Sequence, residues 1–206
     1  MTAATRQPVG EQPTLPRLRV APVPRIDLAA AEHAAGALLA ALGLDLDDPV
    51  LAGTPGRMVR GYAELLTPRD FVPTTFPNDE RYDEMVVARG IPFVSVCEHH
   101  LLPFTGLAAV GYLPADRLLG LSKLARVVDV FARRPQVQER MTTQIADWLH
   151  AELRPRGVGV VIAGEHTCMT LRGAVARGAT TVTSTMRGAM RDDERTRAEF
   201  LAHANG

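Results

Sequence analysis

Residues 97–100, with the sequence Cys-Glu-His-His, place three residues of the kinds that bind zinc within four positions. The other cysteine of the chain, Cys168, also lies beside a histidine, in the segment His-Thr-Cys. A thiolate binds zinc strongly, and an imidazole nitrogen is a ligand of suitable softness. Cys97 and His100 can reach one ion, with Cys168 as a third ligand. Three protein ligands leave a position open for water or substrate, as catalytic zinc sites do. The pattern therefore favours the metal centre of an enzyme.

Three other interpretations of these residues are weaker. Free cysteines are often simply buried, but burial gives no reason for both of them to lie beside histidines. A disulfide between Cys97 and Cys168 is disfavoured because the N-terminus lacks the basic-then-apolar layout of an export signal. A nucleobase deaminase also uses His/Cys/Cys ligation, but its signature ends in a Cys-x-x-Cys pair, which this chain cannot form. In the zinc interpretation His99 is left for proton chemistry.

The composition is that of a soluble globular protein. Of its 206 residues, 46% are hydrophobic and 22% charged, which is enough for one domain with a sizeable core. No stretch approaches the roughly 20 consecutive apolar residues of a membrane span. The formal net charge is zero, which gives no general attraction to nucleic acid or to anionic membranes. We therefore expect a cytoplasmic protein with neither nucleic acid nor membrane as a partner.

The N-terminal third of the sequence reads as a tail followed by helices. Residues 1–25 contain five prolines and little apolar periodicity, which predicts a flexible tail. A helix is expected from Asp27, a good N-cap, to residue 41 or 42, before Gly43. A second helix is expected to begin with Thr54 as its cap and Pro55 as its first residue. Together they form a predicted helical segment over 26–68, and a proline-punctuated loop is expected over 69–83.

The rest of the chain, 69–206, reads as one domain of mixed helices and strands. The expected elements are a pair of strands, two helices, further strands and a closing helix, which favours an α+β fold with helices laid on a mostly antiparallel sheet. The strands are expected at 91–97, 107–113, 157–162, 169–172 and 180–185, and the helices at 122–132, from Pro135 onward, and at 193–202.

A second group of residues suits a polyphosphate. Lys123 and Arg126 are three apart on an expected helix and so share a face. Ser122 lies at the start of that helix, where backbone N–H groups favour anions. Taken alone, such charges are more often a solvated helix face.

Glu139 is a candidate for base recognition. It stands in the first turn of an expected helix, where a carboxylate gains modestly from the helix dipole, and this is the simpler explanation of it. In the functional interpretation, its two oxygens accept the parallel N1–H and amine donors of guanine, a pair that the other nucleobases do not present.

Taken together, these segments closely resemble the GTP cyclohydrolase I family, in order and in spacing. The resemblance runs from about Thr54 to Asn205. Its motifs are Cys-Glu-His-His at 97–100, Gly-Leu-Ser-Lys at 120–123, Arg-Pro-Gln-Val-Gln-Glu-Arg at 134–140, and His-Thr-Cys-Met at 166–169 with Arg-Gly at 172–173.

The resemblance implies a tunnelling fold (T-fold): an antiparallel sheet with helices on one face, which subunits pool into a barrel. It also implies a homodecamer of two pentamers, with active sites at subunit interfaces. The implied reaction converts GTP and water to 7,8-dihydroneopterin triphosphate and formate, the first step toward tetrahydrofolate and other pterins.

The resemblance also assigns roles to individual residues. Those that match the family's positions are the Zn²⁺ ligands Cys97, His100 and Cys168; the catalytic histidines His99 and His166; the triphosphate contacts Ser122, Lys123, Arg126 and Arg172; Arg57, contributed by a neighbouring subunit; and the guanine contacts Gln138 and Glu139. Two alternatives remain: a paralogue with the same chemistry on another purine nucleotide, and a non-catalytic relative that only binds a pterin or nucleotide. A binding module, however, has no need of an open metal site.

Overall fold

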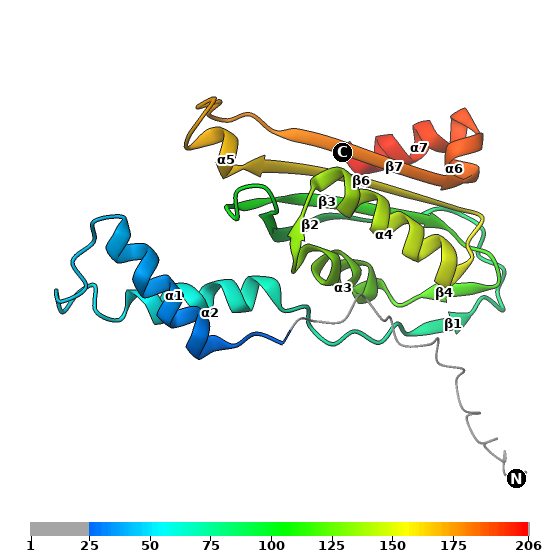
Figure 1. Cartoon of the computed structure of the whole chain (residues 1–206). Helices are drawn as coiled ribbons and strands as arrows, with labels where there is room; N and C mark the ends of the chain where they lie inside the picture. The colour runs from blue at the N-terminus through cyan, green and yellow to red at the C-terminus, as the bar shows by residue number, and fades with distance from the viewer. Residues whose placement is uncertain (1–24, 206) are drawn as a thin grey trace, which may run out of the picture.

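The computed structural model describes residues 25–205, so the tail predicted for 1–25 lies, except for Arg25, outside the described residues. The chain forms a curled sheet with helices packed on it and a pair of helices to one side (Figure 1). The elements in chain order are α1 (Leu28–Ala41), α2 (Thr54–Leu66), β1 (Thr75–Pro77), β2 (Val86–Cys97), β3 (Pro103–Leu113), β4 (Arg117–Leu119), α3 (Leu121–Ala132), β5 (Pro135–Gln136), α4 (Gln138–Leu153), β6 (Gly157–His166), α5 (Thr167–Thr170), β7 (Thr181–Gly188), α6 (Ala189–Asp192) and α7 (Glu194–Asn205).

The two N-terminal helices follow the sequence signals closely. The Asp27 side chain accepts a hydrogen bond from the Ala30 N–H at 3.0 Å and caps α1, as predicted. Just beyond its end, Gly43 has a φ of 86°, a conformation that favours glycine. Helix α2 begins one residue earlier than predicted, because Gly53 is its N-cap and Thr54 is its first residue.

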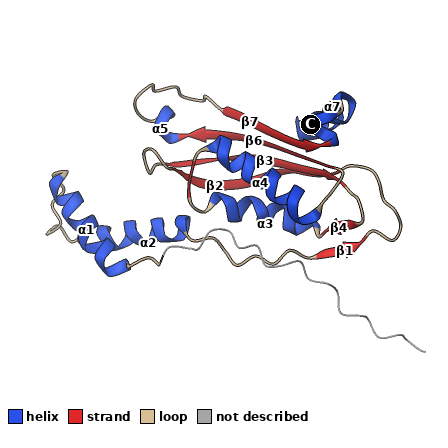
Figure 2. Cartoon of the chain, turned by 45° about the vertical axis from the view of Figure 1, so that its right-hand side comes forward, coloured by secondary structure: helices blue, strands red, loops and turns tan. Residues whose placement is uncertain are grey.

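The main sheet has the strand order β5-β2-β3-β6-β7. Neighbouring strands are antiparallel except β2 and β5, which run parallel, so the prediction of a mostly antiparallel sheet is confirmed. Helices α3 and α4 lie side by side across it (Figure 2). They cover β2, β6 and β7, and their apolar residues form the core with one face of the strands.

The prediction that the helices lie on one face of the sheet is wrong for α7. Val110 and Val160 point into the core beneath α3 and α4, so their neighbours Gly111 and Gly159 point to the other face. There both glycines lie against the fully buried Phe200 of α7. A Cβ on Gly159 would come 2.6 Å from the Phe200 ring. The missing side chains therefore make the space that lets α7 dock on this face.

Part of that second face carries an apolar row of three residues. Leu107, Ala163 and Val182 are paired directly across β3, β6 and β7, and side chains that are paired in this way share a face. Leu107 is 55% exposed and Val182 is 64% exposed. Apolar side chains in a continuous exposed row are typical of a surface that another molecule covers.

Two element predictions are wrong and one pair of strands was not expected. Residues 169–172 were predicted as a strand, but the Leu171 N–H bonds to the Thr167 carbonyl in the helical turn of α5. The helix expected from Pro135 begins at Gln138, because Pro135 and Gln136 pair with the end of β2 instead. Strand β1 lies within the predicted loop and pairs with β4. For Pro135 and for β1 the partner strand is distant in sequence, which local patterns do not register.

Gly106 provides a test of the sheet packing. A Cβ there would lie 2.8 Å from the Gly164 Cα, and closer still to the Ala163 carbonyl oxygen, so rigid backbone would have to move. We expect Gly106→Ala to lower the free energy of unfolding by about 1–3 kcal/mol, the usual cost of overpacking. Gly61→Ala in α2 is the matched control, because nothing lies within 4 Å of its Cβ position. Equal urea midpoints for the two variants would contradict the prediction.

Candidate metal centre

Strands β2 and β6 deliver the two halves of the predicted metal centre to one end of the sheet. Both strands pair with β3, and Phe104 of β3 lies between Ser95 and His166 in the register. Strand β2 ends at Cys97, where a tight loop closes with hydrogen bonds between Cys97 and Leu101 and between Cys97 and Leu102, both 2.8 Å. Strand β6 ends at His166, and the turn of α5 then presents the second cysteine.

The three predicted ligands converge. The Cys97 Sγ lies 3.7 Å from the His100 Nδ1 and 4.0 Å from the Cys168 Sγ. All three ligand atoms lie within 4.8 Å of one another, the one such group found among residues 25–205. Tetrahedral zinc bonds imply separations of about 3.8 Å between two sulfurs and about 3.5 Å between sulfur and nitrogen. The two separations that involve Cys97 are within a few tenths of an ångström of these values, and the remaining pair, Cys168 and His100, lies within 4.8 Å, so the site fits a zinc ion after a shift of up to about 1 Å in one side chain.

The thiol chemistry also favours a cation over a disulfide. At 4.0 Å the two sulfurs are not bonded, and both cysteines are free. Burial raises the pKa of the Cys168 thiol, and the neighbouring Cys97 raises it further, whereas the positive charge of Arg172 acts in the opposite direction. Two thiolates this close repel each other, so a bound cation is what would stabilise both.

A cavity of about 210 Å³ opens beside these ligands. Besides the three ligands, its lining includes four other residues that were predicted as functional: His99, Gln138, Glu139 and His166. Its volume is below the roughly 300–1,000 Å³ of pockets that enclose drug-sized ligands. Within one chain, the cavity therefore has room for the reacting part of a nucleotide rather than for the whole molecule.

His166 is held firmly at the side of this cavity. Its ring stacks on Phe104, with 4.3 Å between the ring centroids and an 8° angle between the planes. Its Nε2 lies 2.8 Å from the Gln138 Oε1. Burial lowers the pKa of His166, and the negative charge of Glu139 partly opposes that effect. Burial thus favours the neutral form of the ring.

Gln138, predicted as a guanine contact, has its side-chain amide held by other parts of the chain. Its side chain is only 1% exposed, and both ends of its amide are hydrogen-bonded within the chain. Gln138 and Glu139 both line the cavity, but Glu139 is exposed. Within the predicted guanine-binding pair, Glu139 is therefore the one whose side chain remains available.

An ion pair between Glu98 and Arg140 was missed by the sequence analysis. The Arg140 guanidinium contacts both carboxylate oxygens of Glu98 and also donates to Gln136 Oε1 at 3.1 Å and to the Pro135 carbonyl at 3.2 Å. The hydrogen bonds from Arg140 hold the pKa of Glu98 below its usual range. The pair ties the metal-binding loop to the start of α4. Both residues belong to motifs that carry the family resemblance, but they are 42 positions apart, and no local sequence pattern predicts that they pair.

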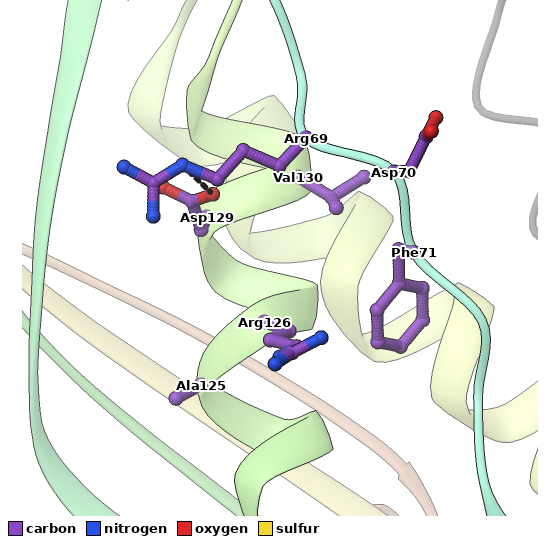
Figure 3. A pocket seen from close by; sticks show the side chains of 7 residues that line it. All are labelled: Arg69, Asp70, Phe71, Ala125, Arg126, Asp129 and Val130. Carbon is purple, nitrogen blue, oxygen red and sulfur yellow. Dashed lines mark ion pairs between the residues drawn. The ribbon is translucent and has the colours of Figure 1, made fainter.

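The predicted triphosphate residues on α3 lie away from this cavity. Ala132, at the far end of α3, accepts a hydrogen bond from Ser95, close to Cys97. Ser122 is ten residues back along the helix, or about 15 Å at 1.5 Å per residue. Arg126 instead lines another pocket with Arg69, Asp129 and others (Figure 3), and Lys123 lies over the nearby Phe71 ring, 6.0 Å from its centroid.

Of the two remaining predicted arginines, one lies near the metal ligands and the other does not line the cavity. Arg172 is close enough to Cys168 for its charge to act on that thiol. Arg57, in the first turn of α2, donates hydrogen bonds to the Val50 carbonyl and to Thr54 Oγ1, and it does not line the cavity.

The sequence profile of the family described as GTP cyclohydrolase I matches residues 31–205. The chain belongs to the GTP cyclohydrolase I family. It is 50% identical over 182 residues to GTP cyclohydrolase 1 of Mycobacteroides abscessus, which covers 85% of this chain and 88% of that protein. It is 51% identical over 184 residues to the Mycolicibacterium vanbaalenii protein, covering 86% and 90% of the two chains. It is 53% identical over 169 residues to the Streptomyces coelicolor protein, covering 79% and 83%.

Family membership agrees with the resemblance seen in the sequence. The matched stretch contains both halves of the metal centre and all of the sheet. Every helix of this GTP cyclohydrolase I family member within residues 25–205 is too short or too polar to cross a membrane.

Proposed function

We propose that this enzyme converts GTP and water to 7,8-dihydroneopterin triphosphate and formate, with Zn²⁺ held by Cys97, His100 and Cys168. The observation that carries the proposal is the convergence of these three ligands on a cavity lined by His99, Glu139 and His166. Residues from three separate segments thus meet with the chemistry that the reaction needs: a metal site, proton carriers and an acceptor for guanine.

Zinc is favoured by the donor set. Two sulfurs and one imidazole nitrogen are soft ligands, whereas magnesium and calcium prefer oxygen. Three ligands are one fewer than a structural zinc site has. When bound, zinc supplies Lewis acidity to water and to the purine.

Glu139 supports guanine as the base. It stands at the start of α4, lines the cavity and is the first acidic residue of its helix. Its carboxylate accepts hydrogen bonds, and guanine presents the N1–H and the exocyclic amine side by side. Adenine lacks this pair of donors, so the carboxylate discriminates against ATP.

His99 and His166 supply the proton transfers. Opening the imidazole ring of guanine requires a proton on the nitrogen that leaves C8, and opening the ribose requires another. Histidine exchanges protons near neutral pH, and a positioned acid or base typically contributes about 10²–10⁴-fold to a rate. Both rings line the cavity that holds the metal ligands.

We further propose that a second copy of the chain completes the site, in a decamer of two pentamers. Ser122, Lys123 and Arg126 do not line the cavity of their own chain, so they would serve the cavity of a neighbour, as would Arg57. Arg172, beside Cys168, serves its own. The exposed apolar row of Leu107, Ala163 and Val182 supports pooled sheets.

The direct test is to incubate the purified protein with GTP and measure formate together with pterin fluorescence. We expect both products with GTP, neither after treatment with a chelator, and recovery when zinc is restored. ATP is the comparison substrate, and turnover of ATP as fast as GTP would instead indicate a paralogue with another purine as its substrate. Nucleotide binding without formate release would reject the enzymatic function.

Glu139→Gln tests base recognition. The amide replaces one acceptor oxygen with a donor that faces the donors of guanine, so we expect GTP binding to weaken by about 1–3 kcal/mol. Calorimetry on the zinc-loaded protein measures this directly. Glu152→Gln, in the last turn of the same helix and outside the cavity, is the control. The assignment fails if GTP binds both variants with wild-type affinity.

A further inference from the structure

The orientation of the Gln138 side-chain amide is fixed by its surroundings. Its Nε2 lies 3.1 Å from the Ile162 carbonyl oxygen, 2.9 Å from the Thr181 carbonyl oxygen and 3.1 Å from the Thr183 Oγ1. Main-chain oxygens can only accept hydrogen bonds. The amide nitrogen must therefore face them, because the reverse orientation would place the amide oxygen against the two main-chain oxygens of Ile162 and Thr181.

That orientation decides which nitrogen of His166 carries a hydrogen. With the Gln138 nitrogen facing the main chain, its Oε1 faces the His166 Nε2 at 2.8 Å. A carbonyl oxygen only accepts, so Nε2 must donate. A neutral imidazole has one N–H and one lone pair. The lone pair is consequently on Nδ1, and the stacking on Phe104 keeps the ring from turning over.

We propose that Gln138 is a positioning residue that holds His166 as the Nε2–H tautomer, so that Nδ1 is the nitrogen that exchanges protons with the substrate. The inference rests on the proposed catalytic role of His166, and it replaces the predicted contact between Gln138 and guanine. A guanine contact would require the 1%-exposed side chain of Gln138 to give up hydrogen bonds that it already makes.

Gly164 provides the space that this arrangement needs. It lies on β6, opposite Gly106 and Thr181, and a Cβ there would come 2.6 Å from the Gln138 Oε1. Gly164 is not among the residues that line the cavity. Gly164→Ala should therefore displace the oxygen from His166 without touching the substrate.

The first experiment reads the tautomer without using activity. Zinc-loaded protein labelled with ¹⁵N-histidine is examined by solid-state NMR at about pH 8, above the ordinary histidine pKa of about 6.5. The His166 signals are identified by their loss in His166→Asn. We expect a protonated Nε2 and an unprotonated Nδ1. The opposite pattern in the wild-type protein would by itself overturn the proposal, whether or not the protein releases formate from GTP.

The second experiment separates positioning from binding. In Gln138→Ala and Gly164→Ala we expect kcat to fall about 10–100-fold, the usual loss when the partner that orients an active-site histidine is removed. Zinc content and KM for GTP should stay near wild-type. Gly61→Ala, the open glycine on α2, is the control for a new methyl group.

The variants also distinguish the competing role. If KM rises in Gln138→Ala while kcat is unchanged, Gln138 is a guanine contact and the proposal is wrong. If both variants keep wild-type kcat and KM, the hydrogen bond has no role in the reaction, which also overturns it. If the wild-type tautomer is as expected but GTP yields no formate, the proposed function fails while the hydrogen-bonding assignment stands.

Discussion

A Cys168→Ser variant is expected to lose its zinc and its release of formate from GTP together. A serine hydroxyl is not deprotonated near neutral pH, so only Cys97 and His100 would remain as strong ligands. Metal ions contribute several kcal/mol to the transition states that they stabilise. At about 1.4 kcal/mol per tenfold change in rate, the activity should fall by at least about 10³-fold. Metal analysis and a formate assay on the same preparation measure the two losses.

The control for this variant comes from the same turn. Leu171 is 76% exposed and belongs to no part of the metal centre, so Leu171→Ala should keep both zinc and activity. Cys168→Ser with full zinc content and full activity would remove Cys168 from the ligand set. The count of three protein ligands, from which the open coordination site was inferred, would then no longer hold.

His166→Asn is expected to keep zinc and to lose most of its turnover. His166 is not a member of the ligand cluster, so metal content should match the wild-type protein. Removing a positioned proton donor or acceptor should lower kcat by about 10²–10⁴-fold. Steady-state kinetics and metal analysis separate this result from that of Cys168→Ser, in which both quantities fall.

His150→Asn controls for a histidine change that lies outside the cavity. His150 occupies the last turn of α4, far along the helix from Glu139, and its replacement should leave kcat unchanged. A wild-type kcat in His166→Asn would transfer the proton chemistry to His99, the other histidine that lines the cavity without belonging to the ligand cluster.

The metal ligands could be predicted because their chemistry is distinctive even without a structure. Two cysteines that each neighbour a histidine have few other uses, and the structure brings Cys97, His100 and Cys168 within reach of one ion. The role of Gln138 could not be predicted in this way. Its partners Ile162, Thr181 and His166 lie 24 to 43 positions away, and only the pairing of β6 with its neighbours brings them to the amide.

The same distinction holds for the fold. Long strands with strong apolar patterns, such as β3 and β6, were predicted within a few residues of their bounds. Pro135 was misread because its pairing with the distant Val96 outweighs local propensity. Residues 169–172 were misread because an apolar run of this length does not distinguish a strand from a helical turn. The docking of α7 on the second face depends on Phe200 meeting two glycines of other strands, and a mostly polar helix sequence does not reveal it.

The ion pair between Glu98 and Arg140 joins the metal-binding loop to the start of α4, so we expect binding of the ion and binding of the nucleotide to be interdependent. Glu98 follows the first cysteine of the ligand set, and Arg140 follows the carboxylate that would receive the base. A bound ion that orders the loop would also restrain the start of α4. The protein would then lose less conformational entropy when the nucleotide binds. By thermodynamic reciprocity, the nucleotide must then strengthen retention of the ion by the same factor.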